Sequence, residues 1–166
     1  MSEPRELPQG RHGWLRHARL YWLPPLLWMT VMFVLSTDTF AAEHTGGVLW
    51  DVFQKLAPRV TYDHYTLLHF LIRKAAHLTE YAILACLLLR AFRAGAAQAW
   101  HWRWGTLAFG LVALHAGLDE YHQAFTQYRT AAMADSVLDM SGGLLALGLL
   151  WLTRHKPARL DRYKPV

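Results

Sequence analysis

The sequence of 166 residues contains a single cysteine, Cys86, and few charged residues. One cysteine excludes an internal disulfide and a zinc cluster built from cysteines. The chain also lacks a phosphate-cradling glycine loop, a nucleophile elbow and a known phosphatase signature. Charged residues make up only 17% of the chain, and no uninterrupted apolar run reaches the ~20 residues that a transmembrane helix needs.

The composition that is present favours a membrane protein. Hydrophobic residues account for 54% of the chain, while the mean hydropathy of +0.09 leaves a soluble protein open. Eight Trp and seven Tyr are many for this length, and they cluster near the ends of the apolar segments, as aromatic residues do at membrane interfaces. The formal charge of +5 is not gathered into one patch with interleaved aromatics, so we expect no nucleic-acid partner.

Four apolar segments predict an all-α fold, a four-helix transmembrane bundle. The predicted spans are residues 20–35, about 67–92, about 104–125 and 135–152. They divide the chain into a loose basic arm (1–19), a four-span membrane domain (20–153) and a basic tail (154–166). A signal peptide is the rival interpretation of the first apolar segment, but Pro24 and Pro25 interrupt it and no small-x-small cleavage site follows Leu35.

The distribution of basic residues predicts the orientation. The arm and the tail are rich in Arg and Lys, and the loop between the second and third spans holds several basic residues and no acid. Basic loops stay on the cytoplasmic side of a membrane. We therefore expect a multi-pass membrane protein with both termini in the cytoplasm.

A short helix is expected in the first extracytoplasmic loop. Residues 48–56 place apolar side chains at helical spacing, which predicts a helix lying along the membrane interface. The alternative is an ordinary amphipathic surface helix.

Ionisable residues replace apolar ones at one end of the last three spans. The apolar runs fall short at their extracytoplasmic ends, and ionisable residues fill the missing length each time. A soluble four-helix bundle, which is the alternative fold, would not predict a shortfall in one direction. Ionisable groups inside a membrane usually mark a polar site between helices.

The first polar stripe lies on the second span. At ~100° per residue, one arc of ~120° collects five side chains, namely Arg73, Lys74, His77, Glu80 and Tyr81. The opposite side of the same helix is apolar, and the helix continues into apolar sequence. This pattern predicts a polar site buried against other helices.

The third and fourth spans carry matching polar residues. On the third, His115, Asp119, His122 and Gln123 fall within ~100° of arc, and Glu120 points further round. On the fourth, Asp135 and Asp139 share a face with Gly142, and Arg129 lies in the loop between the two spans. We expect the three helices to combine these charges in one pocket open to the outside or to the outer leaflet.

Four interpretations of this pocket remain open. The cations and carboxylates could form a purely structural network; they could bind an anionic headgroup without turnover; they could act as a membrane hydrolase or transferase on a lipid phosphate; or His115, Asp119 and His122 could bind a metal with Glu120 or His77. We expect no cofactor and no metal. The candidate catalytic residues are His77, Glu80, Glu120 and Asp135, and the candidate ligand-binding residues are Arg73, Lys74, Tyr81, Asp119, His122, Gln123, Arg129 and Asp139.

These motifs resemble those of the VanZ-like family of bacterial membrane proteins. The resemblance rests on the runs 73–81, 119–123 and 135–142, with Arg129 and with Ser36 after the first span, and it covers about residues 36–151. It implies a four-span helical membrane protein and, for the founding members, an association with teicoplanin tolerance, but no settled biochemical activity. The resemblance to bacterial membrane proteins also leads us to expect a place in the bacterial inner membrane. From the cations of the pocket and its expected outer-leaflet position, the expected partners are membrane lipids and a lipid-linked cell-wall precursor or lipoglycopeptide. The family's marked positions correspond to His77, Glu80, Tyr81, Glu120, Gln123, Arg129, Asp135, Asp139 and Gly142.

Overall fold

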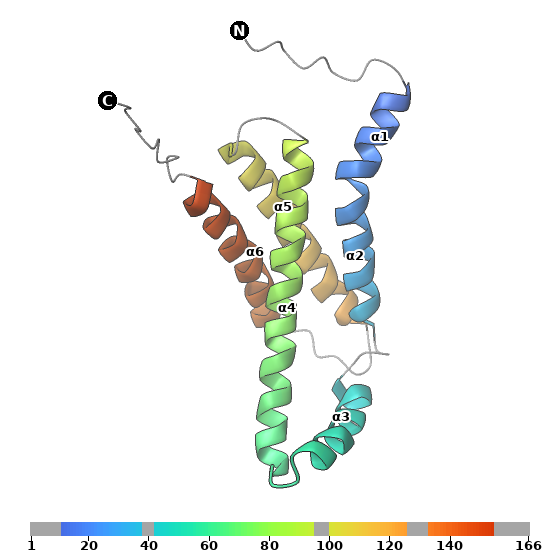
Figure 1. The fold of residues 1–166 in the computed structure, drawn as a ribbon, viewed down its shortest axis with the longest axis vertical. Helices are drawn as coiled ribbons and strands as arrows, with labels where there is room; N and C mark the ends of the chain where they lie inside the picture. The colour runs from blue at the N-terminus through green and yellow to red at the C-terminus, as the bar shows by residue number, and fades with distance from the viewer. Residues whose placement is uncertain (1–10, 38–41, 95–99, 126–132, 155–166) are drawn as a thin grey trace, which may run out of the picture.

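The computed structural model describes residues 11–37, 42–94, 100–125 and 133–154, and the regular structure in these ranges is helical throughout. The six helices are α1 (Arg11–Tyr21), α2 (Leu23–Leu35), α3 (Ala42–Leu56), α4 (Tyr62–Arg93), α5 (Trp102–Gln123) and α6 (Met133–Arg154). The all-α prediction is confirmed. Helices α4, α5 and α6 pack against one another, α2 packs along α4, and α3 lies beside the lower part of α4 (Figure 1).

Residues 11–19, predicted to be part of a loose arm, form α1 instead. That prediction rested on the prolines and glycines of residues 1–19, of which only Gly13 lies within α1. Tertiary contacts also favour the helix. The guanidinium of Arg90 on α4 lies over the Tyr21 ring, 5.4 Å from its centre. Helices α1 and α2 meet at an angle of 44°, because Pro24 and Pro25 occupy the first turn of α2 and cannot continue the backbone hydrogen bonds of α1.

Two of these helices are long and apolar enough to cross a membrane. They are α4 and the segment Asp135–Thr153 of α6, and the bent pair α1–α2 is a third if it counts as one span. Helix α5 is not among them, because ionisable and polar residues interrupt its apolar sequence. The described residues thus hold two or three candidate spans, where the sequence predicted four.

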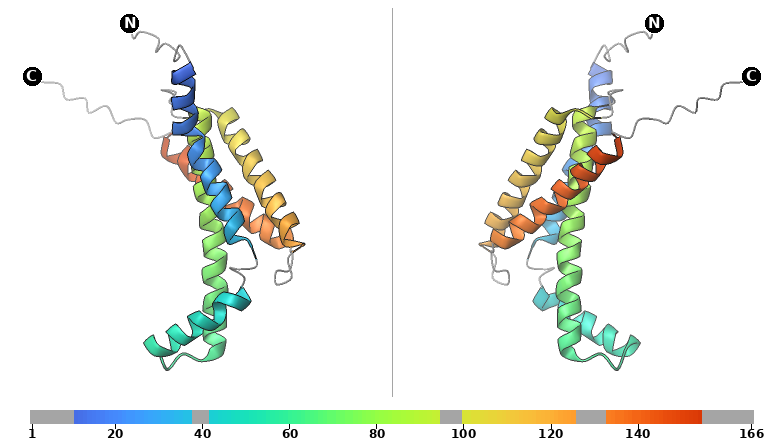
Figure 2. Two further views of the ribbon diagram at one scale, coloured as in Figure 1. Left: turned by 90° about the vertical axis from the view of Figure 1, so that its right-hand side faces the viewer. Right: turned by 90° about the vertical axis from the view of Figure 1, so that its left-hand side faces the viewer.

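Basic residues gather at one end of the bundle. Figures 1 and 2 place α1, the end of α4, the start of α5 and the end of α6 together at the top of the molecule. These segments carry Arg16, Arg19, Arg90, Arg93 and Arg103. The other end of the bundle is formed by the last turn of α2, the last turns of α5 and the first turns of α6.

Helix α4 extends beyond the other bundle helices. Its 32 residues correspond to a length of about 48 Å, and α3 packs against the protruding part (Figure 2). The Trp50 ring meets the Tyr65 ring at 5.1 Å, and the Tyr65 hydroxyl donates a hydrogen bond to the Gly46 carbonyl oxygen at 2.5 Å. The predicted helix in the first loop is therefore present and longer than expected, while its position at a membrane interface stays a prediction.

The apolar core lies where α4, α5 and α6 meet. Leu84, Leu88, Ala108 and Val112 are fully buried there. Towards the end opposite the arginines, this core gives way to polar side chains at Tyr81. The polar site therefore begins directly where the apolar core ends.

Candidate functional site

Two basic side chains of α4 meet two carboxylates of α6. Lys74 Nζ forms an ion pair and hydrogen bond with Asp135 Oδ1. One turn further along, His77 Nδ1 lies 3.4 Å from Asp139 Oδ1, close enough for an ion pair but without the alignment of a hydrogen bond. Spacings of three and four residues put each pair on facing sides of the two helices. Two residues of the polar stripe predicted on the second span thus contact the carboxylates predicted on the fourth span.

A glycine lets α4 and α6 approach closely enough for these contacts. A Cβ atom at Gly142 would lie 3.0 Å from the Leu78 carbonyl carbon and closer still to the carbonyl oxygen. Any larger residue at this position would press on the α4 backbone itself, which has no rotamer to change. Gly142 lies three residues beyond Asp139, so it sets the distance between the helices next to the His77 contact.

Helix α5 contributes a buried hydrogen-bonded pair. The Gln123 side-chain amide donates to Asp119 Oδ2 at 2.9 Å and to Ser36 Oγ at 3.0 Å. All three side chains are buried. The Gln123 amide therefore connects α5 with the end of α2 and orients one oxygen of Asp119.

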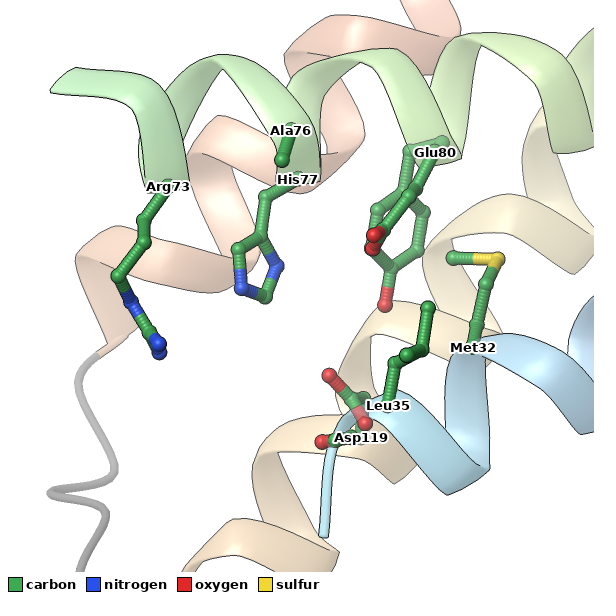
Figure 3. A pocket seen from close by; sticks show the side chains of 9 residues that line it. Met32, Leu35, Arg73, Ala76, His77, Glu80 and Asp119 are labelled. Carbon is green, nitrogen blue, oxygen red and sulfur yellow. The ribbon is translucent and has the colours of Figure 1, made fainter. Parts of the chain in front are cut away.

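A cavity of about 150 Å³ opens between these groups. In Figure 3, Arg73, His77 and Glu80 point from α4 into one space, Asp119 faces them from α5, and Met32 and Leu35 close the side formed by α2. The complete lining consists of Met32, Leu35, Ser36, Arg73, Ala76, His77, Glu80, Tyr81 and Asp119. The cavity therefore combines a guanidinium, an imidazole, two carboxylates and two hydroxyls within an otherwise apolar bundle.

Tyr81 is a deeply buried residue of the cavity lining. Its side chain is 1% exposed, and its hydroxyl has no hydrogen-bond partner among the described residues. The carboxylates of Asp119, Asp139, Glu80 and Glu120 lie near enough to interact with it electrostatically. A buried hydroxyl without a partner is unfavourable, so this one can donate a hydrogen bond to a molecule in the cavity.

A second cavity of about 380 Å³ adjoins the first. It is lined by Phe33, His115, Leu118, Asp119, Tyr121, His122 and Phe125, so Asp119 belongs to both cavities. The His122 ring packs on the Phe33 ring with 4.5 Å between their centres. His122 therefore faces the second, mostly apolar cavity and not the polar one.

The structure brings most of the predicted site residues together. Arg73, His77, Glu80, Tyr81 and Asp119 line the polar cavity. Lys74, Gln123, Asp135 and Asp139 contact one another or the lining residues next to it. Glu120 is half-buried and lines neither of the two cavities, and Arg129 lies outside the described residues. The catalytic and binding roles assigned to these residues stay predictions.

Sequence reasoning missed the contribution of α2. Met32, Leu35 and Ser36 line the polar cavity, and the Trp28 indole N–H donates to the Glu80 backbone oxygen at 3.0 Å. At helical spacing these four residues share one face within ~100° of arc. That periodicity was the available signal, but it was hidden because nearly every residue of the segment is apolar.

The residues considered for a metal site do not form one. Within the described ranges, no group of three or more His, Cys, Asp or Glu side chains is arranged to hold a metal ion. His115, one of the candidates, instead lies with its ring centre 5.9 Å from that of Tyr81 and interacts with the backbone of Met29.

Comparison with known proteins shows a match to a protein family. The model of a family described as VanZ/LLP1 matches residues 21–154, which include all helices from α2 to α6. No curated protein and no solved structure matches the chain.

Proposed function

The chain belongs to the VanZ/LLP1 family, and from this premise we propose that its polar cavity binds the anionic headgroup of a membrane lipid, a lipid-linked cell-wall precursor or a lipoglycopeptide. The family and the candidate spans together indicate a membrane protein. In the proposed topology, α1–α2, α4, α5 and α6 are the four membrane spans. Both termini then lie in the cytoplasm of a bacterial cell, and the cavity faces the outer leaflet. Helix α3 lies along the extracytoplasmic surface of this membrane.

One observation carries this proposal: a cavity that contains Arg73 and His77 at the end of the bundle opposite its basic end. If the arginine-rich end faces the cytoplasm, as such ends do, then the cavity lies at the depth of outer-leaflet headgroups. A guanidinium there binds phosphate or carboxylate through paired, charge-assisted hydrogen bonds.

The structural-network alternative explains only part of the arrangement. Lys74 with Asp135, and Gln123 with Asp119, do connect the helices. A network that serves stability alone would satisfy its buried polar atoms. The Tyr81 hydroxyl and Asp119 Oδ1 are buried without a hydrogen-bond partner in the described part of the chain, which favours a site that binds a ligand.

Binding of phosphatidylglycerol to the full-length protein in detergent tests the proposal. Arg73→Gln should weaken binding at least tenfold, since a charge-assisted hydrogen bond contributes about 1.5–3 kcal/mol. The matched control is Arg103→Gln, because Arg103 lies over the Trp102 ring at the opposite end of the bundle. Equal binding by wild type and Arg73→Gln would refute a headgroup site at this cavity.

The proposed orientation has its own test. In a Cys86→Ser background, Thr61→Cys places a thiol at the exposed start of α4, and Arg103→Cys places one at the exposed start of α5. In intact cells an impermeant thiol reagent should label the first and spare the second. The reverse pattern would invert the topology and remove the cavity from the outer leaflet.

A membrane hydrolase or transferase acting on a lipid phosphate is the second candidate. The observation that favours it is the contact between His77 and Asp139, because a carboxylate beside an imidazole orients a general base, and such contacts are often long before substrate binds. Asp135 forms an ion pair with Lys74, so its role would be to hold α4 and α6 together beside His77. Release of phosphate from a labelled lipid phosphate by wild type, and its loss in His77→Ala with binding retained, would identify an enzyme.

The VanZ family is associated with teicoplanin resistance. We propose that this chain influences antibiotic tolerance of the cell envelope through the same cavity. Expression in a susceptible bacterium should raise the inhibitory concentration of teicoplanin, and Arg73→Gln should cancel that rise at equal protein level. If expression of the wild-type protein leaves the inhibitory concentration of teicoplanin unchanged, the proposed role of this chain in antibiotic tolerance is wrong.

A further inference from the structure

The apolar cavity between α2 and α5 opens on the outer side of the bundle. Its wall residues Phe33, Leu118, Tyr121 and Phe125 are all exposed on the outside of the bundle. Helix α2 packs closely along α4 but meets α5 chiefly through side chains, such as the Phe33 contact with His122. The two helices thus leave a side opening at the level of the polar site.

Asp119 joins this apolar cavity to the polar one. Its side chain lines both, and the residue is only 7% exposed. Gln123 satisfies Oδ2, whereas Oδ1 has no hydrogen-bond partner among the described residues. A buried carboxylate oxygen without a donor is costly, so this atom indicates where a ligand would place an O–H or N–H group.

The charges of the polar cavity restrict the ligand further. Arg73 attracts an anion, but Glu80 and Asp119 line the same cavity and repel one. A headgroup that carries only negative charge would therefore be attracted by Arg73 and repelled by the two carboxylates. A headgroup with an anion and a hydrogen-bond donor satisfies both sides at once.

Resting on the proposed function, we infer that the ligand is an amphiphile that enters sideways between α2 and α5. Its phosphate or carboxylate lies near Arg73, a hydroxyl or ammonium donor of its headgroup binds Asp119 Oδ1, and its acyl chain occupies the apolar cavity beside Leu118 and Phe125. The site is thus a single bipartite site for a lipid from the bilayer and not a site for a free anion from solution.

Binding to full-length protein in detergent distinguishes the two sources of the anion. Dioleoyl phosphatidylglycerol supplies the anion, the hydroxyls and the chains, and glycerol 3-phosphate supplies the headgroup alone. Wild type should bind the lipid at least tenfold more tightly. Leu118→Trp, which fills the apolar cavity, should weaken lipid binding about tenfold and leave glycerol 3-phosphate binding unchanged.

The matched control is Leu114→Trp. Leu114 is 58% exposed, against 55% for Leu118, lies one turn earlier on α5 and lines neither cavity. If both variants bind the lipid as wild type does while Arg73→Gln does not, the side route is wrong and the headgroup site stands. If Arg73→Gln also binds normally, the proposed function itself fails.

The donor to Asp119 is tested by changing the headgroup. Phosphatidylmethanol has the same anion and chains as phosphatidylglycerol but no hydroxyl. Wild type should prefer phosphatidylglycerol about tenfold, as expected for one hydrogen bond to a charged group, and Asp119→Ala should abolish the preference. Equal affinity of wild type for the two lipids would overturn the assignment of Asp119 Oδ1.

Photocrosslinking gives a readout that needs no variant. A phosphatidylglycerol with a photoreactive group in its acyl chain, incubated with the wild-type protein, should label Phe33, Leu118, Tyr121 or Phe125. Labelling of Leu107 and Leu114 to the same extent would overturn the proposal, because these exposed residues of α5 line neither cavity.

Discussion

Replacing Gly142 by alanine tests the close packing of α4 and α6. The added Cβ would lie 3.0 Å from the Leu78 carbonyl carbon and 3.1 Å from its Cα, where ordinary contacts are 3.4–4 Å. Since these atoms and the still nearer Leu78 carbonyl oxygen all belong to the backbone, the helices must separate by roughly 1 Å. That movement also lengthens the neighbouring contact between His77 and Asp139.

The expected loss of stability follows from two opposing effects. Overpacking costs about 1–3 kcal/mol, while alanine in place of glycine stabilises a helix by about 0.5–1 kcal/mol. Because the obstructing atoms are backbone and cannot move aside, the upper part of the overpacking range, about 2–3 kcal/mol, applies. The difference is a destabilisation of about 1–2.5 kcal/mol, which lowers the Tm by about 2–10 °C. Thermal unfolding of the purified protein in detergent measures it.

Gly148→Ala is the control on the same helix, because a Cβ there meets nothing within 4 Å. It should leave the Tm unchanged or raise it slightly. A Gly142→Ala protein as stable as wild type, or one that behaves as Gly148→Ala does, would refute the close approach of α4 to α6.

Two further predictions concern single contacts. Asp139→Ala should destabilise the protein by about 1–3 kcal/mol and Asp135→Ala by at most about 1 kcal/mol, because the Asp139 side chain is 6% exposed and the Asp135 side chain is 39% exposed; comparison of their Tm values checks this, and equal losses would contradict it. Trp28→Phe should cost about 0.5–1.5 kcal/mol, since it removes the hydrogen bond to the Glu80 backbone oxygen; a Tm equal to that of wild type would show that this bond does not stabilise the protein.

The local part of the site could be predicted from the sequence. The side chains from Arg73 to Tyr81 share one face of α4 because helical periodicity is fixed by neighbouring residues alone. The same reasoning put Asp119 and Gln123 on one face of α5, where the Gln123 side-chain amide donates a hydrogen bond to Asp119.

The pairing between helices could not be predicted in the same way. Lys74 and Asp135 are 61 residues apart, and whether they meet depends on the register and distance of α4 and α6. That register is set by backbone contacts such as the one at Gly142, which periodicity does not reveal. His122 shows the limit: it shares a face with Asp119 in projection, but the Phe33 ring holds it in the second cavity.

The role of α2 was hidden for a different reason. Its sequence is apolar almost throughout, so nothing in it separates side chains that face lipid from those that line a polar cavity. Ser36 forms its contact with Gln123 across 87 residues. Helix α1 was missed because the prolines and glycines at and before its start indicated a loose segment, whereas contacts such as Arg90 over Tyr21 arise only in the folded protein.

The most direct test of the headgroup site is an experimental structure of the full-length protein in phosphatidylglycerol nanodiscs. We predict density for one headgroup between Arg73 and Asp119, with its chain leaving past Leu118 between α2 and α5. Lipid density confined to the outer surface of the helices, with the Arg73 guanidinium turned away from the cavity, would contradict it.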